Sequence, residues 1–296
     1  MNPISILKKY YQKPFRIEVE SGVGVIFYKM LSKVFGLIYT LYNYRPLLLS
    51  RSKTRIIKAQ ILKNKKSVFV FANGPSLVDI DLNKIKKLIK SGGYDLIAVN
   101  SFLSKSAHEI QPTFAIFSDN LHFKTDDKNS QFAQDIEICN RNGIRYFVPF
   151  QHLNNKSIQQ IGYNAFCDIF SSNTTNILTP PGFYGLTALH ALRVAKYLGY
   201  HKIYMCGFDN SYFKDFEVKK DGEMVIRHRH YYDQNTDGID VPCIYERSSE
   251  FFFDSYRHFK YIEKITKDSS RFENLAQTTY INTIKRNTEL DVYKQS

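Results

Sequence analysis

Polar side chains follow four apolar segments of the sequence, each at the point where the segment ends. These residues are Asn73, Gly74, Pro75 and Ser76 after the first segment, Asn100 after the second, Asp119 after the third, and Gly207 and Asp209 after the fourth. Amides, hydroxyls and carboxylates beside a glycine that lets the backbone approach a ligand are suited to binding a nucleotide. The first loop matches neither the GxGxxG pattern nor the P-loop pattern, and taken alone it could be only a tight turn.

A second cluster, Arg227–Gln234 with the sequence RHRHYYDQ, could take part in proton transfer. If the chain is extended there, His228, His230 and Tyr232 face one way. Histidine titrates near neutral pH and suits a general base, and tyrosine hydroxyls can hold a phosphate leaving group without a metal. The alternative is a solvent-exposed basic hairpin, because most such histidine pairs are not catalytic and no third ligand suggests zinc.

Short apolar runs alternate with helical stretches after residue 66. Strands are predicted at 68–71, 96–99, 114–117, 146–149 and 202–206, and helices at 81–90, 129–142 and 186–198. This alternation predicts an α/β fold with a mostly parallel, Rossmann-like sheet. Because ligands bind beyond the carboxyl ends of such strands, the polar residues at the strand ends are expected to form one site.

Two elements are predicted near the C-terminus. Residues 251–265 form an aromatic amphipathic helix, which belongs to the core or to a lid. A final strand begins near residue 272, and Asn274 at its polar end could reach the nucleotide.

The positive charge is concentrated at the N-terminus. Residues 1–66 carry fourteen Lys or Arg against two acidic residues, whereas residues 67–296 carry 27 basic and 26 acidic side chains. The nearly neutral body argues against a nucleic-acid-binding protein. We predict a basic membrane-associating segment over 1–66 and a catalytic domain over 67–296.

The segment from Val23 to Asn43 is apolar except for small or polar residues that recur at helical spacing, among them Lys29 and Lys33. Two lysines in mid-span favour a basic amphipathic helix that lies in an anionic membrane surface over one that crosses the bilayer. The alternative is a helix packed against the body with its lysines in solvent. Residues 1–20 do not resemble a signal peptide, so we expect a cytoplasmic protein peripheral to the membrane.

Four motifs together resemble known families. NGPSL at 73–77, AVNSF at 98–102, FAIFSDN at 114–120 and the stretch 185–213 are similar in order and spacing to the bacterial sialyltransferases of glycosyltransferase family 42. They also resemble the 6-hydroxymethylpterin diphosphokinase-like proteins, which share NGPSL. The similarity covers roughly residues 67–280.

The resemblance to the sialyltransferases implies a variant GT-A domain that binds a CMP-activated acidic sugar and transfers it with inversion, without a metal. It implies nucleotide contacts from Asn73, Gly74, Ser76 and Asn100, a place near the phosphate for Asp119, and donor-sugar contacts from Gly185 and Thr187. The family has an asparagine where Asp119 stands, and the family's arginine near residue 185 is missing here. The implied base is His230 or His228, with Tyr212, Tyr231 and Tyr232 at the phosphate.

We therefore predict a membrane-associated glycosyltransferase. Its donor would be a CMP-activated sialic, nonulosonic or Kdo-type sugar, and its acceptor a lipid-linked glycan such as a lipopolysaccharide or capsule precursor at the bacterial inner membrane. No cofactor or metal is expected. Two alternatives stay open. One is a pterin-type pyrophosphokinase that uses ATP and magnesium, with Asp119 and Asp209 available to the metal, and the other is a non-catalytic component of a glycan assembly complex.

Overall fold

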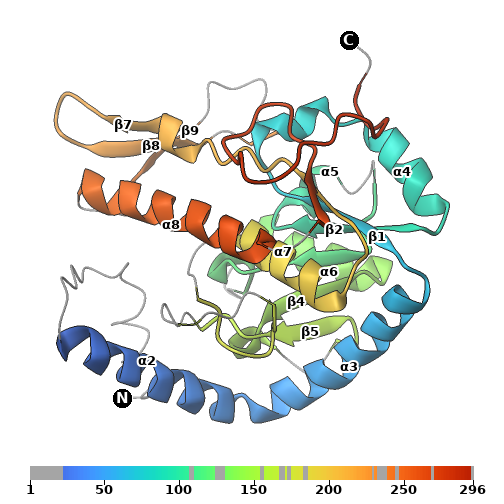
Figure 1. The fold of residues 1–296 in the computed structure, drawn as a ribbon, viewed down its shortest axis with the longest axis horizontal. Coiled ribbons are helices and arrows are strands. Elements are labelled where there is room, and N and C mark those ends of the chain that lie inside the picture. Colours follow the sequence, from blue (N-terminus) through green and yellow to red (C-terminus); the bar gives the residue numbers. More distant parts are fainter. Residues whose placement is uncertain are drawn as a thin grey trace.

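The computed structural model describes most of the chain, and the account below concerns that part. The described residues are 23–106, 110–123, 131–153, 157–166, 171, 175–182, 186–228, 230–231, 239–243, 247–267 and 270–294. A parallel sheet lies at the centre, with helices on both faces (Figure 1).

The central sheet has seven strands in the order β10-β6-β1-β2-β3-β4-β5, and every neighbouring pair is parallel. Alternate residues of β1 enter two different cores, Val68 and Val70 on one face and Phe69 and Phe71 on the other. Burial on both faces explains why the strands are continuously apolar. The strands are Ser67–Phe71 (β1), Tyr94–Val99 (β2), Phe114–Ile116 (β3), Arg145–Pro149 (β4), Gln160–Tyr163 (β5), Ile203–Cys206 (β6) and Phe272–Asn274 (β10).

The predicted Rossmann-like α/β fold is confirmed, and the sheet contains one strand that the sequence did not indicate. β5, with the sequence QIGY, is short and has no run of apolar residues. A glycine is needed at position 162, because a Cβ there would lie 2.5 Å from the Phe150 ring and 2.8 Å from Ser50 Oγ. The close packing against α3, which was not foreseen, is what makes this edge segment a strand.

Helices cover both faces of the sheet. The faces are distinguished by their cores, since α3, α7 and α8 contribute to the core around Val68 and Val70, whereas α4 and α5 contribute to the core around Phe69 and Phe71. The helices are Val23–Tyr42 (α2), Tyr44–Lys63 (α3), Leu82–Lys90 (α4), Phe102–Ser106 (α5), Gln131–Asn142 (α6), Thr187–Leu198 (α7) and Ser248–Thr266 (α8). Short 3₁₀ turns follow several strands, at Pro75–Asp79 (η1), Asn120–Phe123 (η2), Phe150–His152 (η3) and Tyr212–Asp215 (η4).

A small antiparallel sheet stands beside the main one. Its strands are Phe216–Val218 (β7), Met224–His228 (β8) and Ile239–Pro242 (β9), in that order across the sheet. β8 ends at His228, whose backbone pairs with Ile239. The alternation of side chains along β8 therefore stops before His230.

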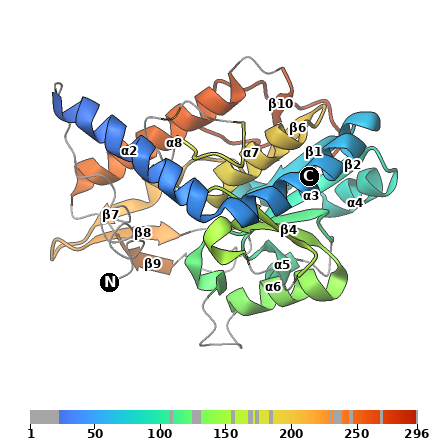
Figure 2. The ribbon, with the colours of Figure 1, turned by 90° about the horizontal axis from the view of Figure 1, so that it is seen from below.

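The N-terminal helices run along the outside of the molecule, where Figure 2 shows α2 and α3 as one bent rod. α3 supplies Ile57 and Ile61 to the core, where they are 5% and 3% exposed. The hydroxyl of its Ser50 accepts a hydrogen bond from Gly162 N at 2.8 Å. The boundary at residue 66 stays a prediction, and α3 packs as part of the α/β body.

α7 lies at the centre of the fold and buries two basic side chains. Arg193 is 1% exposed and donates hydrogen bonds to the carbonyl oxygens of Asn164, Asn176 and Thr179. It thereby fastens the segment after β5 to the helix. The ring of His190 lies 4.8 Å from that of Tyr163, and burial, aided by the charge of Arg193, lowers the pKa of His190 from 6.5 to about 3.

This lowered pKa predicts a loss of stability in acid. Between pH 6.5 and about 3, His190 is protonated in the unfolded chain but neutral in the folded chain. The free energy of unfolding should therefore decrease as the pH drops from 6.5 toward about 3. At about pH 5 the expected loss is ~2 kcal/mol. Thermal melting between neutral pH and pH 5 should show a smaller decrease for His190→Gln than for the wild type. The exposed His201→Gln is the control, and equal decreases in all three proteins would contradict this account.

Candidate functional site

The site lies where the direction of the sheet's winding reverses. β1 lies between β2 and β6 in the sheet. The chain passes from β1 to β2 on one side, and β6, which comes later in the sequence, pairs with the other side of β1. Loops that leave adjacent strands in opposite directions open a crevice at their carboxyl ends. The predicted residues after β1 and β6 border this crevice.

The loops after β1 and β6 are in very close contact. Gly74 N donates a hydrogen bond to Gly207 O at 3.2 Å, and Ser76 N donates to the carboxylate of Asp209 at 3.2 and 3.3 Å. A Cβ on Gly74 would lie 2.0 Å from Asp209 Oδ2 and 2.3 Å from Gly207 O. Position 74 therefore needs a glycine for its size.

Asp209 acts mainly as the acceptor that holds the first loop. It is 6% exposed, and burial raises the pKa of its carboxyl while the hydrogen bonds from Ser76 oppose that rise. The carboxylate also stands at the start of η1, where unpaired backbone N–H groups favour negative charge. Its orientation toward Ser76 N makes it a positioning group for the Asn73–Ser76 loop.

Three residues at the strand ends have left-handed backbone conformations. They are Asn100 after β2, with φ of 46°, and Gly207 and Asn210 after β6, with φ of 70° and 51°. Asparagine tolerates this region better than most residues, but the conformation still costs free energy. Turns held in this way are concentrated at binding and catalytic sites.

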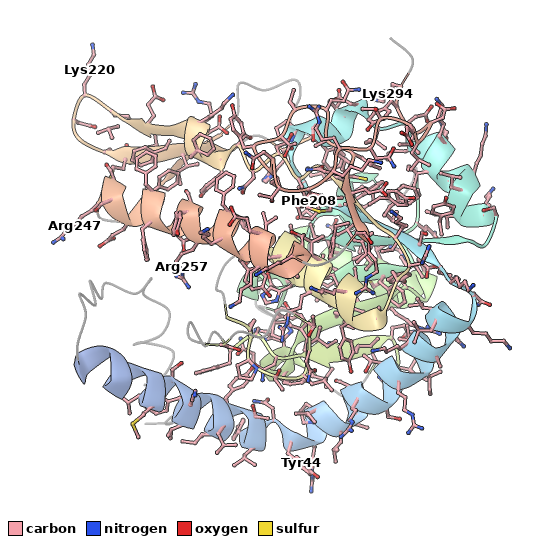
Figure 3. The ribbon with its side chains drawn as sticks, in the orientation of Figure 1. Tyr44, Phe208, Lys220, Arg247, Arg257 and Lys294 are labelled. Atoms are coloured by element: carbon pink, nitrogen blue, oxygen red, sulfur yellow. The ribbon has the colours of Figure 1, made fainter. Side chains whose placement is uncertain are left out.

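A pocket of about 220 Å³ fills the crevice. Its walls come from the ends of β1, β2 and β6, the first turn of α7, η4, and the chain at and after β8. The polar residues in this lining are Asn73, Asn100, Thr187, Asp209, Asn210, Ser211, Tyr212, Asp215, Arg227 and His230. Phe208, labelled near the centre of Figure 3, marks the position of the pocket within the fold.

Three amide groups at the pocket carry unused hydrogen-bonding capacity. Asn73 Oδ1, Asn100 Oδ1 and Asn210 Nδ2 are buried atoms with no hydrogen-bonding partner among the described residues. Leaving such an atom unpaired costs about 1–3 kcal/mol, so buried polar groups normally have partners. All three amides belong to residues that line one pocket, and two acceptors and one donor without partners there fit a polar ligand such as a nucleotide.

The start of α7 adds a positive end to the same pocket. Leu186 precedes the helix and gives no side-chain cap, and Thr187 and Ala188 of the first helical turn line the pocket. The hydroxyls of Thr187 and Ser118 are hydrogen-bonded to each other, which ties the helix to the end of β3. Together with Arg227, this helix end favours an anionic ligand, and His230 lines the same pocket.

The structure brings most of the predicted site residues together. Asn73, Gly74, Pro75, Asn100, Thr187, Gly207, Asp209, Tyr212 and His230 all line the pocket. Ser76 lies directly behind it, 4% exposed, with its N–H on Asp209. Gly185, Tyr232 and the side chain of His228 lie outside the described part of the chain.

Besides Ser76, three predicted residues do not line the pocket. Asp119 is exposed, and its carbonyl accepts from His122 N in η2. The ring of Tyr231 packs into the core 5.9 Å from Phe102, while its backbone N–H donates to Asn73 O at 3.2 Å. A ligand-binding role for these two residues stays a prediction.

Asn274, the third, uses its side chain within the protein. Its Oδ1 accepts from Ala276 N at 2.9 Å, and its Nδ2 donates to Thr279 Oγ1 at 3.3 Å. Thr279 in turn donates to Phe208 O at 2.8 Å. Asn274 therefore acts on the turn after β6 through Thr279, and a direct nucleotide contact stays a prediction.

Sequence reasoning assigned no binding or catalytic role to four polar residues of the lining, Asn210, Ser211, Asp215 and Arg227. If the strand continued past His228, the side chains of Arg227 and His230 would point to opposite faces. Because β8 ends at His228, this alternation does not extend to His230, and both residues line the same pocket. Asp215 comes from η4, a turn with no apolar pattern to place it. Asn210 follows Asp209 directly, and its position beside the GFD motif was the one available signal.

The geometry agrees with what comparison with known proteins shows. Residues 40–215 match the family model described as 6-hydroxymethylpterin diphosphokinase MptE-like. This match spans more than half of the chain, so the protein belongs to the MptE-like family. The matched range contains α3, β1 to β6 and most of the pocket. No protein of curated function matches the sequence.

The close contact at Gly74 predicts a selective effect of one added methyl group. Gly74→Ala should push the Asp209 carboxylate away from Ser76 N and destabilise the loop. We expect ligand binding to weaken at least about tenfold, which corresponds to a loss of about 1.4 kcal/mol of binding free energy. Gly93→Ala is the matched control, because nothing lies within 4 Å of a Cβ there. Nucleotide binding by calorimetry and thermal melting would measure both variants. Similar behaviour of the two variants would be inconsistent with the contact.

Proposed function

We propose that the protein is a transferase that uses a nucleotide-activated donor, and specifically a glycosyltransferase that takes its sugar from a CMP-sugar. The observation that carries the proposal is the set of three unpartnered amide groups in one pocket with the α7 N-terminus, Arg227 and His230. Such a pocket supplies both polar contacts for a nucleoside and positive charge for a phosphate.

In the proposed complex the donor lies along the crevice between β1 and β6. Asn73 and Asn100 bind the nucleoside, and the phosphate lies toward the start of α7 and Arg227. The guanidinium of Arg227 lies 3.5 Å from Glu217 in an exposed pair, which is a weak interaction. A carboxylate on the donor sugar would add a second anion for the same positive end.

His230 is the proposed general base. It accepts the proton of an acceptor hydroxyl, whose oxygen forms a bond to the anomeric carbon of the donor. The bond from that carbon to the phosphate oxygen breaks, and CMP leaves with the electron pair. Tyr212 supports the departing phosphate with its hydroxyl, which stays protonated because burial raises the pKa of Tyr212 to about 12.

A pterin-type pyrophosphokinase is the second candidate, because the family description favours it. This reaction would transfer the diphosphate of ATP to a pterin hydroxyl and release AMP. Asp209 and Asp215, which both line the pocket, are the carboxylates that would hold magnesium with the nucleotide. The carboxylate of Asp209 already accepts hydrogen bonds from Ser76 N.

Nucleotide release distinguishes the two reactions. The purified protein is incubated separately with CMP-sugars, UDP-sugars, and ATP plus a hydroxymethylpterin, each with and without EDTA, and the nucleotide products are separated by chromatography. We expect CMP release from an acidic CMP-sugar that EDTA does not abolish. AMP formation that requires magnesium would replace this proposal by the second candidate, and no product with any donor would favour a non-catalytic role.

The role of His230 has its own test. His230→Ala should lower the rate of CMP release by about 10²–10⁴-fold and leave the affinity for CMP nearly unchanged, because a base acts on the acceptor and not on the nucleotide. The matched control is His201→Ala. His201 is exposed and precedes β6, at the end of the strands opposite the pocket. A His230→Ala protein with unaltered turnover would exclude the assignment.

A further inference from the structure

The helix α2 is attached to the body by its polar side. The residues that face inward recur every three or four positions: Ser32, Gly36, Tyr39 and Asn43, of which Ser32 and Asn43 are 1% and 4% exposed. A Cβ on Gly36 would lie 3.3 Å from Pro180. Apart from Tyr39, whose ring packs against the hydrophobic core, the inner face is small and polar, unlike the apolar inner face of most core-packing helices.

Tyr39 and Thr40 fix this orientation through contacts with η3 and with the segment after β5. The ring of Tyr39 lies 5.4 Å from that of Phe166, and its hydroxyl donates to Gln151 at 3.4 Å. Thr40 Oγ1 accepts from Asn164 Nδ2 at 3.5 Å. Because these contacts occupy one side of α2, the opposite side must point outward.

That opposite side is apolar. Its residues recur at helical spacing: Met30, Val34, Leu37, Ile38 and Leu41 on α2, with Leu48 in line with them on α3. These side chains are between 43% and 64% exposed. We call them the outer stripe. A contiguous apolar surface on the outside of a protein marks an interaction site.

The outer stripe continues from α2 into α3. Asn43 N donates to Tyr39 O at 3.1 Å and Leu47 N donates to Asn43 O at 2.9 Å, so helical bonding is nearly continuous across the junction. Pro46 has no N–H to donate to Tyr42 O, which accounts for the bend between the two helices (Figure 1). Tyr44, at the junction, points away from the body in Figure 3.

The charges beside the outer stripe have a single sign. Residues 23–63 contain eight Lys or Arg and no Asp or Glu. Lys33, Arg45, Arg51 and Arg55 are all exposed. If two copies paired through this surface by two-fold symmetry, each would bring its cations to those of the other. The charge therefore favours an anionic occupant over a second copy.

We infer that the outer stripe and its flanking cations form a docking surface for an anionic lipid bilayer. The apolar side chains enter the boundary between headgroups and acyl chains, and the arginines contact lipid phosphates. Among the described residues, no helix is long and apolar enough to cross a membrane. The inference does not depend on the proposed reaction, although a lipid-linked acceptor would be reached from such a surface.

Vesicle flotation of the full chain tests the inference. The wild type should float with phosphatidylcholine vesicles that contain phosphatidylglycerol, should bind pure phosphatidylcholine vesicles much less, and should be released by high salt. Leu37→Gln/Ile38→Gln/Leu41→Gln should reduce binding at least about tenfold, since interfacial affinity scales with the buried apolar area. Point substitutions are preferable to truncation, because α3 supplies Ile57 and Ile61 to the core.

The controls are exposed residues of the same kind elsewhere. Val218→Gln and Ile158→Gln remove apolar side chains that are 52% and 82% exposed, and should leave binding unchanged. Arg45→Gln/Arg51→Gln/Arg55→Gln should reduce binding to the anionic vesicles, whereas Lys220→Gln/Arg247→Gln/Lys294→Gln, at positions labelled in Figure 3, should have little effect. Circular dichroism confirms that each variant is folded.

Three outcomes would overturn the inference. They are equal flotation of the outer-stripe variant and the controls, equal binding of the wild type to neutral and anionic vesicles, and a dimer in light scattering that only the outer-stripe variant loses. The outer-stripe variant, Leu37→Gln/Ile38→Gln/Leu41→Gln, should still release CMP when a soluble acceptor is supplied. In the wild type, failure of vesicle binding with retained CMP release would reject the docking surface alone, and vesicle binding without CMP release would reject the proposed reaction alone.

Discussion

The contact between the loops after β1 and β6 determines the shape of the site. Gly74 lies so close to Asp209 that no side chain is possible there, and the carboxylate of Asp209 holds Ser76 N. This contact closes one side of the crevice and directs Asn73 into the pocket. Gly207 is required at the same place, because a Cβ there would lie 2.5 Å from Ala72 O.

The surrounding structure makes this contact rigid. On the β6 side, Thr279 donates to Phe208 O and Tyr280 N donates to Asp209 O, so a loop near the C-terminus secures the turn. On the β3 side, Ser118 joins Thr187 at the start of α7. Buried Arg193 then ties α7 to three carbonyl oxygens of the segment after β5. A preorganised pocket of this kind binds and orients a ligand with little loss of entropy.

The same segment after β5 connects the site to the N-terminal helices. Asn164 accepts from Arg193 through its carbonyl and donates to Thr40 of α2 through its side chain. The pocket and the outer stripe are thus attached to one rigid framework through α7. Docking of the outer stripe on a membrane would consequently hold the pocket at a defined orientation toward lipid-linked molecules. This arrangement would suit the proposed lipid-linked acceptor.

Sequence alone predicted the strands of the central sheet other than β5, because strands buried on both faces are continuously apolar and glycine, asparagine or aspartate follows most of them here. It also placed Asn73, Asn100 and Asp209 at one edge. It could not place β5, whose glycine has meaning only against Phe150 and Ser50. Contacts between residues distant in sequence decided that Asn274 bonds Thr279 and that Arg227 joins His230. They also decided that the apolar side of α2 faces outward. Helical periodicity identifies which residues share a side of the helix, but not whether that side faces the protein body or the surroundings.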